Sequence, residues 1–357
     1  MGVIYTFVNQ LYSNCSFSGV DFRILIEEVD KDGVSPQIYA LLVEQGRLEE
    51  TPHFFQVRLL EKVKHNRYSS VFIKCETDRI LTECDKQQYE VIPLKGIYFA
   101  EDYYGDYSHR TTSDIDILIR KERLDDVIQL VKDLGFVEEE THISGHFHRS
   151  FSKPLPHSAI PLTVELHWEL MRPDTSSVDT DFLWSRSVPF KSYDNIKKLS
   201  PTHTFYFMCL HAWRHNLDSI KHDLDVIQTM KHMPRNLAAV LQLAKRHQTY
   251  KRLTRTLAIL YERYPILRER YPSPQVKALW FHKIEKFNWS KAMIFFDYQV
   301  LSYDSLKHRI TETGRLFFSP ESRKYGQLKL KKIKSRLIYL YIRQKQQVRN
   351  MIKAIKL

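Results

Sequence analysis

The sequence predicts an α+β fold in which a small mixed sheet with helices is flanked by N-terminal and C-terminal helical regions. Apolar residues recur at helical spacing through residues 36–89. Short β-prone runs follow through residues 90–170, and helical spacing returns after Ser200. At 357 residues, the chain is long enough for two domains or for one domain with a helical extension.

We expect four regions in chain order. They are an N-terminal helical region at 1–89, an α/β core at 90–195, a helical domain at 196–322 and a basic amphipathic tail at 323–357. Pro36 and Pro52 suit the first turns of two N-terminal helices, because an N–H at that position would have no partner within the helix. The apolar stripe of the second helix consists of Phe55, Leu59, Leu60 and Val63.

The net charge of +12 arises from basic residues in the C-terminal tail. Residues 323–357 contain twelve Lys or Arg and no Asp or Glu, which leaves 42 basic and 42 acidic side chains in residues 1–322. A basic amphipathic helix can lie on an anionic membrane surface, contact RNA, or cover the helical domain with its charges in water. We favour the covering role and keep an anionic partner for the tail as the alternative.

Targeting and cysteine patterns predict a cytoplasmic protein. No apolar run approaches the ~18 residues that span a bilayer, and the N-terminus has no basic stretch ahead of a continuous apolar core. The cysteines lie far apart, without the spacing of a disulfide framework or a zinc site.

The α/β core begins as a strand, a glycine turn and a helix. The run EVIPL at residues 90–94 is β-prone, Lys95 and Gly96 form the turn, and IYFAEDYY is long enough for about two helical turns. In such a turn, backbone N–H groups and the helix N-terminus can face the phosphates of a nucleoside triphosphate.

Further elements of the core follow in order. SDIDILIR at 113–120 has the alternation of a strand, and ERLDDVIQLVKDLGF is an amphipathic helix closed by Gly135. HISGHFHRSF predicts a strand that ends at Pro154, and PLTVELHWEL at 161–170 predicts another. From Ser200 the pattern is helical to at least Tyr264.

Two strands carry acidic side chains that suit a metal ion. Asp114 and Asp116 stand at i and i+2 on a strand and therefore project to one side, close enough to bind the same divalent ions. Glu165 shares its face with Thr163 and His167 on a strand expected to be adjacent, and could complete a two-metal centre and take a proton from an attacking hydroxyl. Oxygen ligands of this kind suit Mg²⁺ (or Mn²⁺).

These motifs together resemble the polymerase-β-like nucleotidyltransferases, and more closely their bacterial subgroup of uncharacterised nucleotidyltransferases. The resemblance spans about residues 85–230. It rests on LKG, on Arg110 followed by SDIDILI, on the helix ending LGF, on VELHW, and on CLHAWRH followed by DLDVIQ.

The resemblance implies that the α/β core is a polymerase-β-like nucleotidyltransferase core. Its catalytic, metal-binding carboxylates would be Asp114, Asp116 and Glu165. Its nucleotide-binding residues would be Lys95, Gly96, Arg110 and Ser113. Asp225, in DLDVIQ, is expected to anchor the packing of a helix, and His211 with His215 to serve packing or phosphate contact.

The implied reaction is Mg²⁺-dependent transfer of a nucleoside monophosphate from a nucleoside triphosphate, with ATP expected, to a hydroxyl, releasing pyrophosphate. The acceptor stays open between a small molecule, a peptide or protein, and RNA. The turn has Lys-Gly where the family has Gly-Gly or Gly-Ser. A non-catalytic nucleotide-binding or interaction protein on the same fold is therefore an alternative, as is an RNA-binding protein that uses the basic tail.

Overall fold

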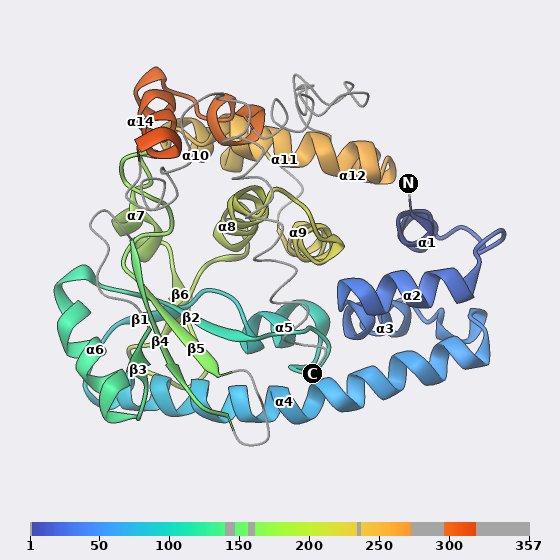
Figure 1. The fold of residues 1–357 in the computed structure, drawn as a ribbon, viewed down its shortest axis with the longest axis horizontal. Helices are drawn as coiled ribbons and strands as arrows, with labels where there is room; N and C mark the ends of the chain where they lie inside the picture. The colour runs from blue at the N-terminus through green and yellow to red at the C-terminus, as the bar shows by residue number, and fades with distance from the viewer. Residues whose placement is uncertain (1, 140–146, 156–160, 234–236, 273–295, 319–357) are drawn as a thin grey trace, which may run out of the picture.

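Helices lie on both sides of a small sheet in the computed structural model, which describes residues 2–139, 147–155, 161–233, 237–272 and 296–318 (Figure 1). The N-terminal helices are α1 (Val3–Ser13), α2 (Phe22–Asp32), α3 (Ser35–Glu44) and α4 (His53–Lys86). The helices of the central region are α5 (Ile97–Tyr104), α6 (Leu124–Asp133) and α7 (Thr180–Ser185). The C-terminal helices are α8 (Pro201–Arg214), α9 (Ile220–His232), α10 (Ala238–Arg246), α11 (Tyr250–Arg263), α12 (Ile266–Arg270) and α14 (Leu306–Phe318).

The sheet is mixed, as predicted, with the strand order β1-β2-β5-β4-β3. Its strands are β1 (Val91–Pro93), β2 (Asp114–Ile119), β3 (Val137–Glu138), β4 (His148–Lys153) and β5 (Leu162–His167). Strands β2 and β5 are parallel, and the other pairs are antiparallel. A separate antiparallel pair joins β6 (Val188–Pro189) to β7 (Lys197–Lys198). The expected strands β1, β2, β4 and β5 are confirmed, whereas the two-residue strands β3, β6 and β7 were not predicted.

The two faces of the sheet pack against different helices. Ile115, Ile117 and Ile119 of β2 lie in one apolar cluster with residues of α4 and α6. On the opposite face, Leu118 lies in a second cluster with residues of α8 and α9. In Figure 1, α4 runs along one side of the sheet, and α8 and α9 lie on the other. Strand β2 is therefore covered on both faces, which explains why Asp116 is buried.

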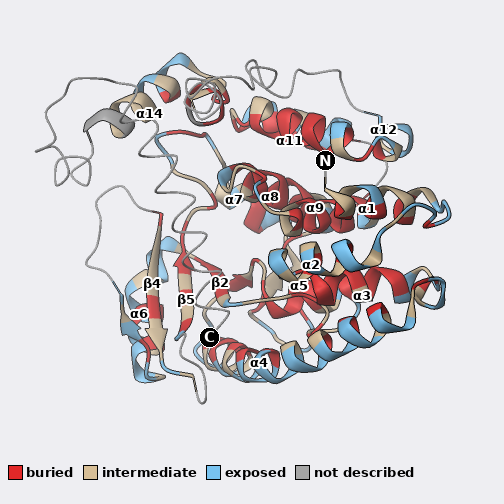
Figure 2. Ribbon diagram, turned by 45° about the vertical axis from the view of Figure 1, so that its right-hand side comes forward, coloured by how far each residue is buried: buried red, intermediate tan, exposed pale blue. Residues whose placement is uncertain are grey.

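N-terminal and C-terminal helices contribute to the same apolar cluster. It takes in Phe7 of α1, Leu41 of α3, Leu210 of α8 and Leu257 of α11. Figure 2 shows α8, α9 and α11 largely buried, whereas α4 has a continuous exposed side. Leu60 of α4 lies on that exposed side at 38% exposure, so its predicted place in the apolar stripe is wrong. No helix within the described ranges is both long and apolar enough to cross a membrane.

Gly96 makes the turn from β1 into α5 possible. Its φ is +87° and its ψ is −138°, a backbone conformation that is essentially restricted to glycine. A β-carbon at this position would lie 3.3 Å from the carbonyl oxygen of Asp114. Both the backbone angle and the close approach of the turn to β2 therefore favour glycine.

Gly96→Ala should lower the free energy of unfolding by about 1–3 kcal/mol, because alanine is strained at this φ and its β-carbon approaches β2. Urea unfolding followed by circular dichroism measures the change. Gly314→Ala is the matched control, since nothing lies within 4 Å of a β-carbon there, and alanine favours its helix. Equal unfolding midpoints for the two variants would contradict the requirement for glycine at position 96.

Candidate functional site

The parallel pairing of β2 with β5 brings the predicted carboxylates together. Asp116 pairs in register with Glu165, and Asp114 pairs with Thr163. Residues opposite one another on neighbouring strands point to the same face. Asp114, Asp116 and Glu165 therefore share the face on which Leu118 packs toward α8 and α9.

Solvent reaches the three carboxylates unequally. The side chain of Asp116 is 2% exposed, whereas that of Asp114 is 31% exposed and that of Glu165 is 26% exposed. Asp116 thus lies beneath the other two, and a ligand from solution can contact Asp114 and Glu165.

Lys95 lies directly against the aspartates. Its Nζ is 2.9 Å from Oδ2 of Asp114 and 2.9 Å from Oδ2 of Asp116, and its side chain is 13% exposed. The contact with Asp114 has hydrogen-bond geometry, whereas Oδ2 of Asp116 is buried and receives no hydrogen bond from the described residues. Lys95, expected beside nucleotide phosphates, is thus paired with carboxylates in this structure.

His167 is a site residue that the sequence analysis did not select. Its Nε2 lies 3.2 Å from Oδ1 of Asp116 and 3.2 Å from Oε2 of Glu165, and its side chain is 6% exposed. The ring of His148, opposite it on β4, lies with its centroid 5.0 Å away. The alternation of β5 had placed His167 on the face of Glu165, and this shared face could have identified it.

The contacts shift the pKa values of these groups in opposite directions. Burial alone would lower the pKa of Lys95, but Asp114 and Asp116 raise it above its usual value. Burial works against the charge of Glu165, yet the hydrogen bond from His167 holds its pKa well below the usual range. Burial raises the pKa of Asp116. In turn, the hydrogen bonds to Asp116 and Glu165 overcome burial and raise the pKa of His167.

Arg110 binds a carboxylate outside this group. Its Nε donates to Oδ1 of Asp225 at 2.9 Å and its second terminal nitrogen donates to Oδ2 at 2.8 Å, with both side chains buried. Tyr104 of α5 donates to the same Oδ1 at 2.9 Å. The contacts confirm Asp225 as a packing anchor of α9. Ser113, in contrast, is exposed immediately before β2.

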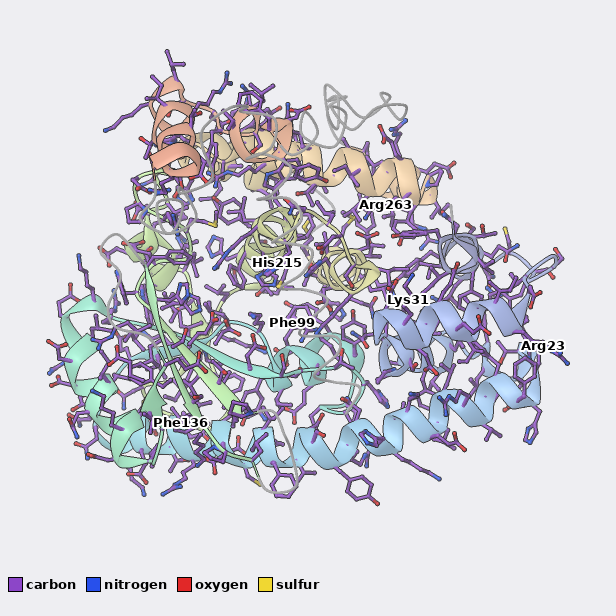
Figure 3. The ribbon with its side chains drawn as sticks, viewed as in Figure 1. Arg23, Lys31, Phe99, Phe136, His215 and Arg263 are labelled. Carbon is purple, nitrogen blue, oxygen red and sulfur yellow. The ribbon has the colours of Figure 1, made fainter. Side chains whose placement is uncertain are left out.

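Basic side chains of α8 and α9 lie near the carboxylates and were not selected from the sequence. Arg214 is close enough to interact electrostatically with Glu165, and Lys221 with Asp114. Loss of hydration lowers the pKa of Lys221 to about 7 and that of His215 to about 4. Figure 3 shows His215 on the side of α8 that faces α5 and the sheet. Its ring centroid is 4.6 Å from that of His211.

Residues 18–265 match the sequence family described as uncharacterised nucleotidyltransferase. The chain belongs to this nucleotidyltransferase family. The matched segment contains β1 to β7, all three carboxylates, and the helices from α2 to α11. A nucleoside triphosphate is accordingly the substrate class of this enzyme.

One solved structure is similar over part of this chain. A crystal structure of an antigenic nucleotidyltransferase-like protein from Paracoccidioides brasiliensis is 15% identical in sequence, with a TM-score of 0.37. The alignment covers 58% of this nucleotidyltransferase and 91% of that chain. Among curated proteins, no sequence matches significantly.

The donor atoms of this candidate site fit a hard divalent cation. In the described part of the chain, Asp116, Glu165 and His167 are the one group of three side chains whose ligand atoms lie within 4.8 Å of one another. Asp114 adds a further carboxylate beside them. The oxygens suit Mg²⁺, and a set that includes an imidazole suits Mn²⁺ as well.

Two expectations fall outside the described residues. The basic tail at 323–357, with its proposed anionic partner, is one of them. The other is the first half of the predicted strand HISGHFHRSF, whose second half forms β4.

Arg110→Met should lower the free energy of unfolding by about 3–5 kcal/mol, because it leaves the buried Asp225 carboxylate without its charged partner. Chemical denaturation of the full chain measures the loss. The control Arg58→Met removes an ion pair to Asp30 from an arginine that is 46% exposed, and should cost less than about 1 kcal/mol. Similar losses in the two variants would show that the buried pair has no special structural role.

Proposed function

We propose that the enzyme transfers a nucleoside monophosphate from a nucleoside triphosphate to a hydroxyl acceptor, and that the reaction requires Mg²⁺ or Mn²⁺. Asp114, Asp116 and Glu165 would hold the metal, with His167 beside them. The observation that carries the proposal is the convergence of three carboxylates from two adjacent strands on a face that solvent reaches. We propose ATP as the nucleotide.

In the proposed reaction, the acceptor oxygen forms a bond to the α-phosphorus while the bond from that phosphorus to the leaving oxygen breaks. Pyrophosphate leaves, and the hydroxyl proton passes to Glu165. A bound divalent ion would neutralise charge that develops on the phosphoryl oxygens. Because the hydrogen bond from His167 keeps the pKa of Glu165 low, Glu165 is ionised at neutral pH, which is the state in which a carboxylate can accept a proton.

The turn before α5 is proposed to bind the phosphates. Backbone N–H groups at the start of α5 follow Gly96, where a helix N-terminus favours an anion. Lys95 would contribute a positive charge to the same anion. Ser113 is exposed next to Asp114 and would offer a hydroxyl. Arg110, engaged by Asp225, would act by holding the segment that leads to Ser113.

The acceptor is proposed only as a class, a hydroxyl on a small molecule, on a peptide or protein, or on RNA. Label from α-labelled ATP offered with each kind of acceptor should enter a product, with release of pyrophosphate. Nucleotide binding without any transfer, over all three classes, would favour the non-catalytic alternative.

Mg²⁺ or Mn²⁺ with a non-hydrolysable ATP analogue should raise the unfolding temperature of the wild-type protein, and Asp116→Asn should abolish the rise. A ligand that binds only the native state at about 100 times its Kd stabilises it by about 2.7 kcal/mol. Differential scanning calorimetry measures both proteins with and without the ligands.

Asp125→Asn is the matched control, since Asp125 is an exposed aspartate in the first turn of α6. It makes the same chemical change away from the site and should keep the full rise. If Asp116→Asn responds to metal and nucleotide as strongly as Asp125→Asn does, the carboxylates do not form the metal site.

A further inference from the structure

Lys95 contacts both of the aspartates that would hold a metal ion. Its ammonium lies 2.9 Å from Oδ2 of Asp114 and 2.9 Å from Oδ2 of Asp116. The other oxygen of Asp116, Oδ1, faces Nε2 of His167 at 3.2 Å. A divalent ion held by the two aspartates would therefore compete with the Lys95 ammonium for their oxygens.

The net charge around the three carboxylates depends on where the Lys95 ammonium lies. Three carboxylates carry three negative charges, and Lys95 between two of them compensates one at contact distance. An ammonium at this distance also repels a second cation, and the repulsion is strong where the side chains are poorly hydrated, as Lys95 and Asp116 are. Free Mg²⁺ or Mn²⁺ thus meets both a lower negative charge and an occupied pair of oxygens.

The backbone keeps Lys95 beside the aspartates. A β-carbon at Gly96 would lie 3.3 Å from the carbonyl oxygen of Asp114, so the turn runs close to β2. Leu94 donates its N–H to the carbonyl oxygen of Asp116 at 3.0 Å. Lysine nevertheless has a flexible four-carbon side chain, so its ammonium can move while the backbone stays in place. A polyphosphate bound at the start of α5 would be a stronger anionic partner for it than two carboxylates that are themselves engaged by a metal ion.

We propose that Lys95 is a place-holding cation. In the nucleotide-free enzyme it occupies the aspartate pair and suppresses the binding of free divalent ions. When a metal–triphosphate complex enters, the Lys95 ammonium turns to the phosphates, and Asp114 and Asp116 would then hold the metal ion. Metal and nucleotide therefore bind together, each strengthening the other. The inference rests on the proposed function, since it takes Asp114 and Asp116 as metal ligands.

The test measures Mn²⁺ binding to the full chain by the loss of the free-ion electron paramagnetic resonance signal, without nucleotide. Lys95→Met should bind Mn²⁺ at least about tenfold more tightly than the wild type, because the variant lacks the competing charge. Lys95→Arg keeps the charge and should bind as the wild type does. Lys198→Met is the control, since Lys198 pairs with Asp102 on the surface and should not change Mn²⁺ affinity.

Adding a non-hydrolysable ATP analogue completes the test. The affinity of the wild type for Mn²⁺ should rise when the analogue is added. The affinity of Lys95→Met should rise much less, because this variant already lacks the competing charge and also lacks the phosphate contact. Calorimetry in parallel shows whether each variant is folded before Mn²⁺ is added. A Lys95→Met chain that folds only with Mn²⁺ bound would also support the inference.

The failure of this inference can be distinguished from failure of the proposed function. If the wild type and Lys95→Met bind Mn²⁺ equally without nucleotide, and Asp116→Asn abolishes the binding, Lys95 is not a place-holder but the metal site stands. If none of these proteins binds Mn²⁺ with or without the analogue, the metal site itself is wrong, and the inference fails with it.

Discussion

The parallel contact between β2 and β5 is the constraint on which the rest of the site depends. It sets Asp116 beside Glu165 at a depth where water is largely excluded from Asp116. Carboxylates in such a place lose hydration and repel one another, so positive groups have to lie within contact distance. Lys95, in the turn after β1, supplies the positive charge, and His167 of β5 lies within hydrogen-bond distance of Asp116 and Glu165.

The surrounding helices hold these charges in position through one buried carboxylate. Asp225 of α9 accepts hydrogen bonds from Tyr104 of α5 and from Arg110 in the segment before β2. Both of these elements adjoin the site, because α5 follows Lys95 in the chain and the segment ends at Asp114. The Asp225 carboxylate therefore ties α9 to the two segments that flank the site.

Local patterns were sufficient for much of the fold and for part of the site. Alternation of polar and apolar residues identified β2 and β5, and the glycine turn identified the start of α5. The two-residue strands were not predicted, because two residues are too few to show an alternation of polar and apolar side chains. Leu60 was misplaced because the long helix α4 has apolar residues on its exposed side as well. His167 was seen on the face of Glu165, but its bond to Asp116 joins residues 51 positions apart.

By itself, the sequence determined which side chains share a face of each strand, because that alternation follows from backbone geometry alone. This alternation placed Asp114 on the same face as Asp116, and Glu165 on the same face as His167. Only the tertiary structure decided that these two strands are neighbours, that Lys95 turns to the aspartates, and that Arg110 pairs with Asp225. Burial and charge compensation between residues far apart in the chain select such pairings, and no local pattern encodes them.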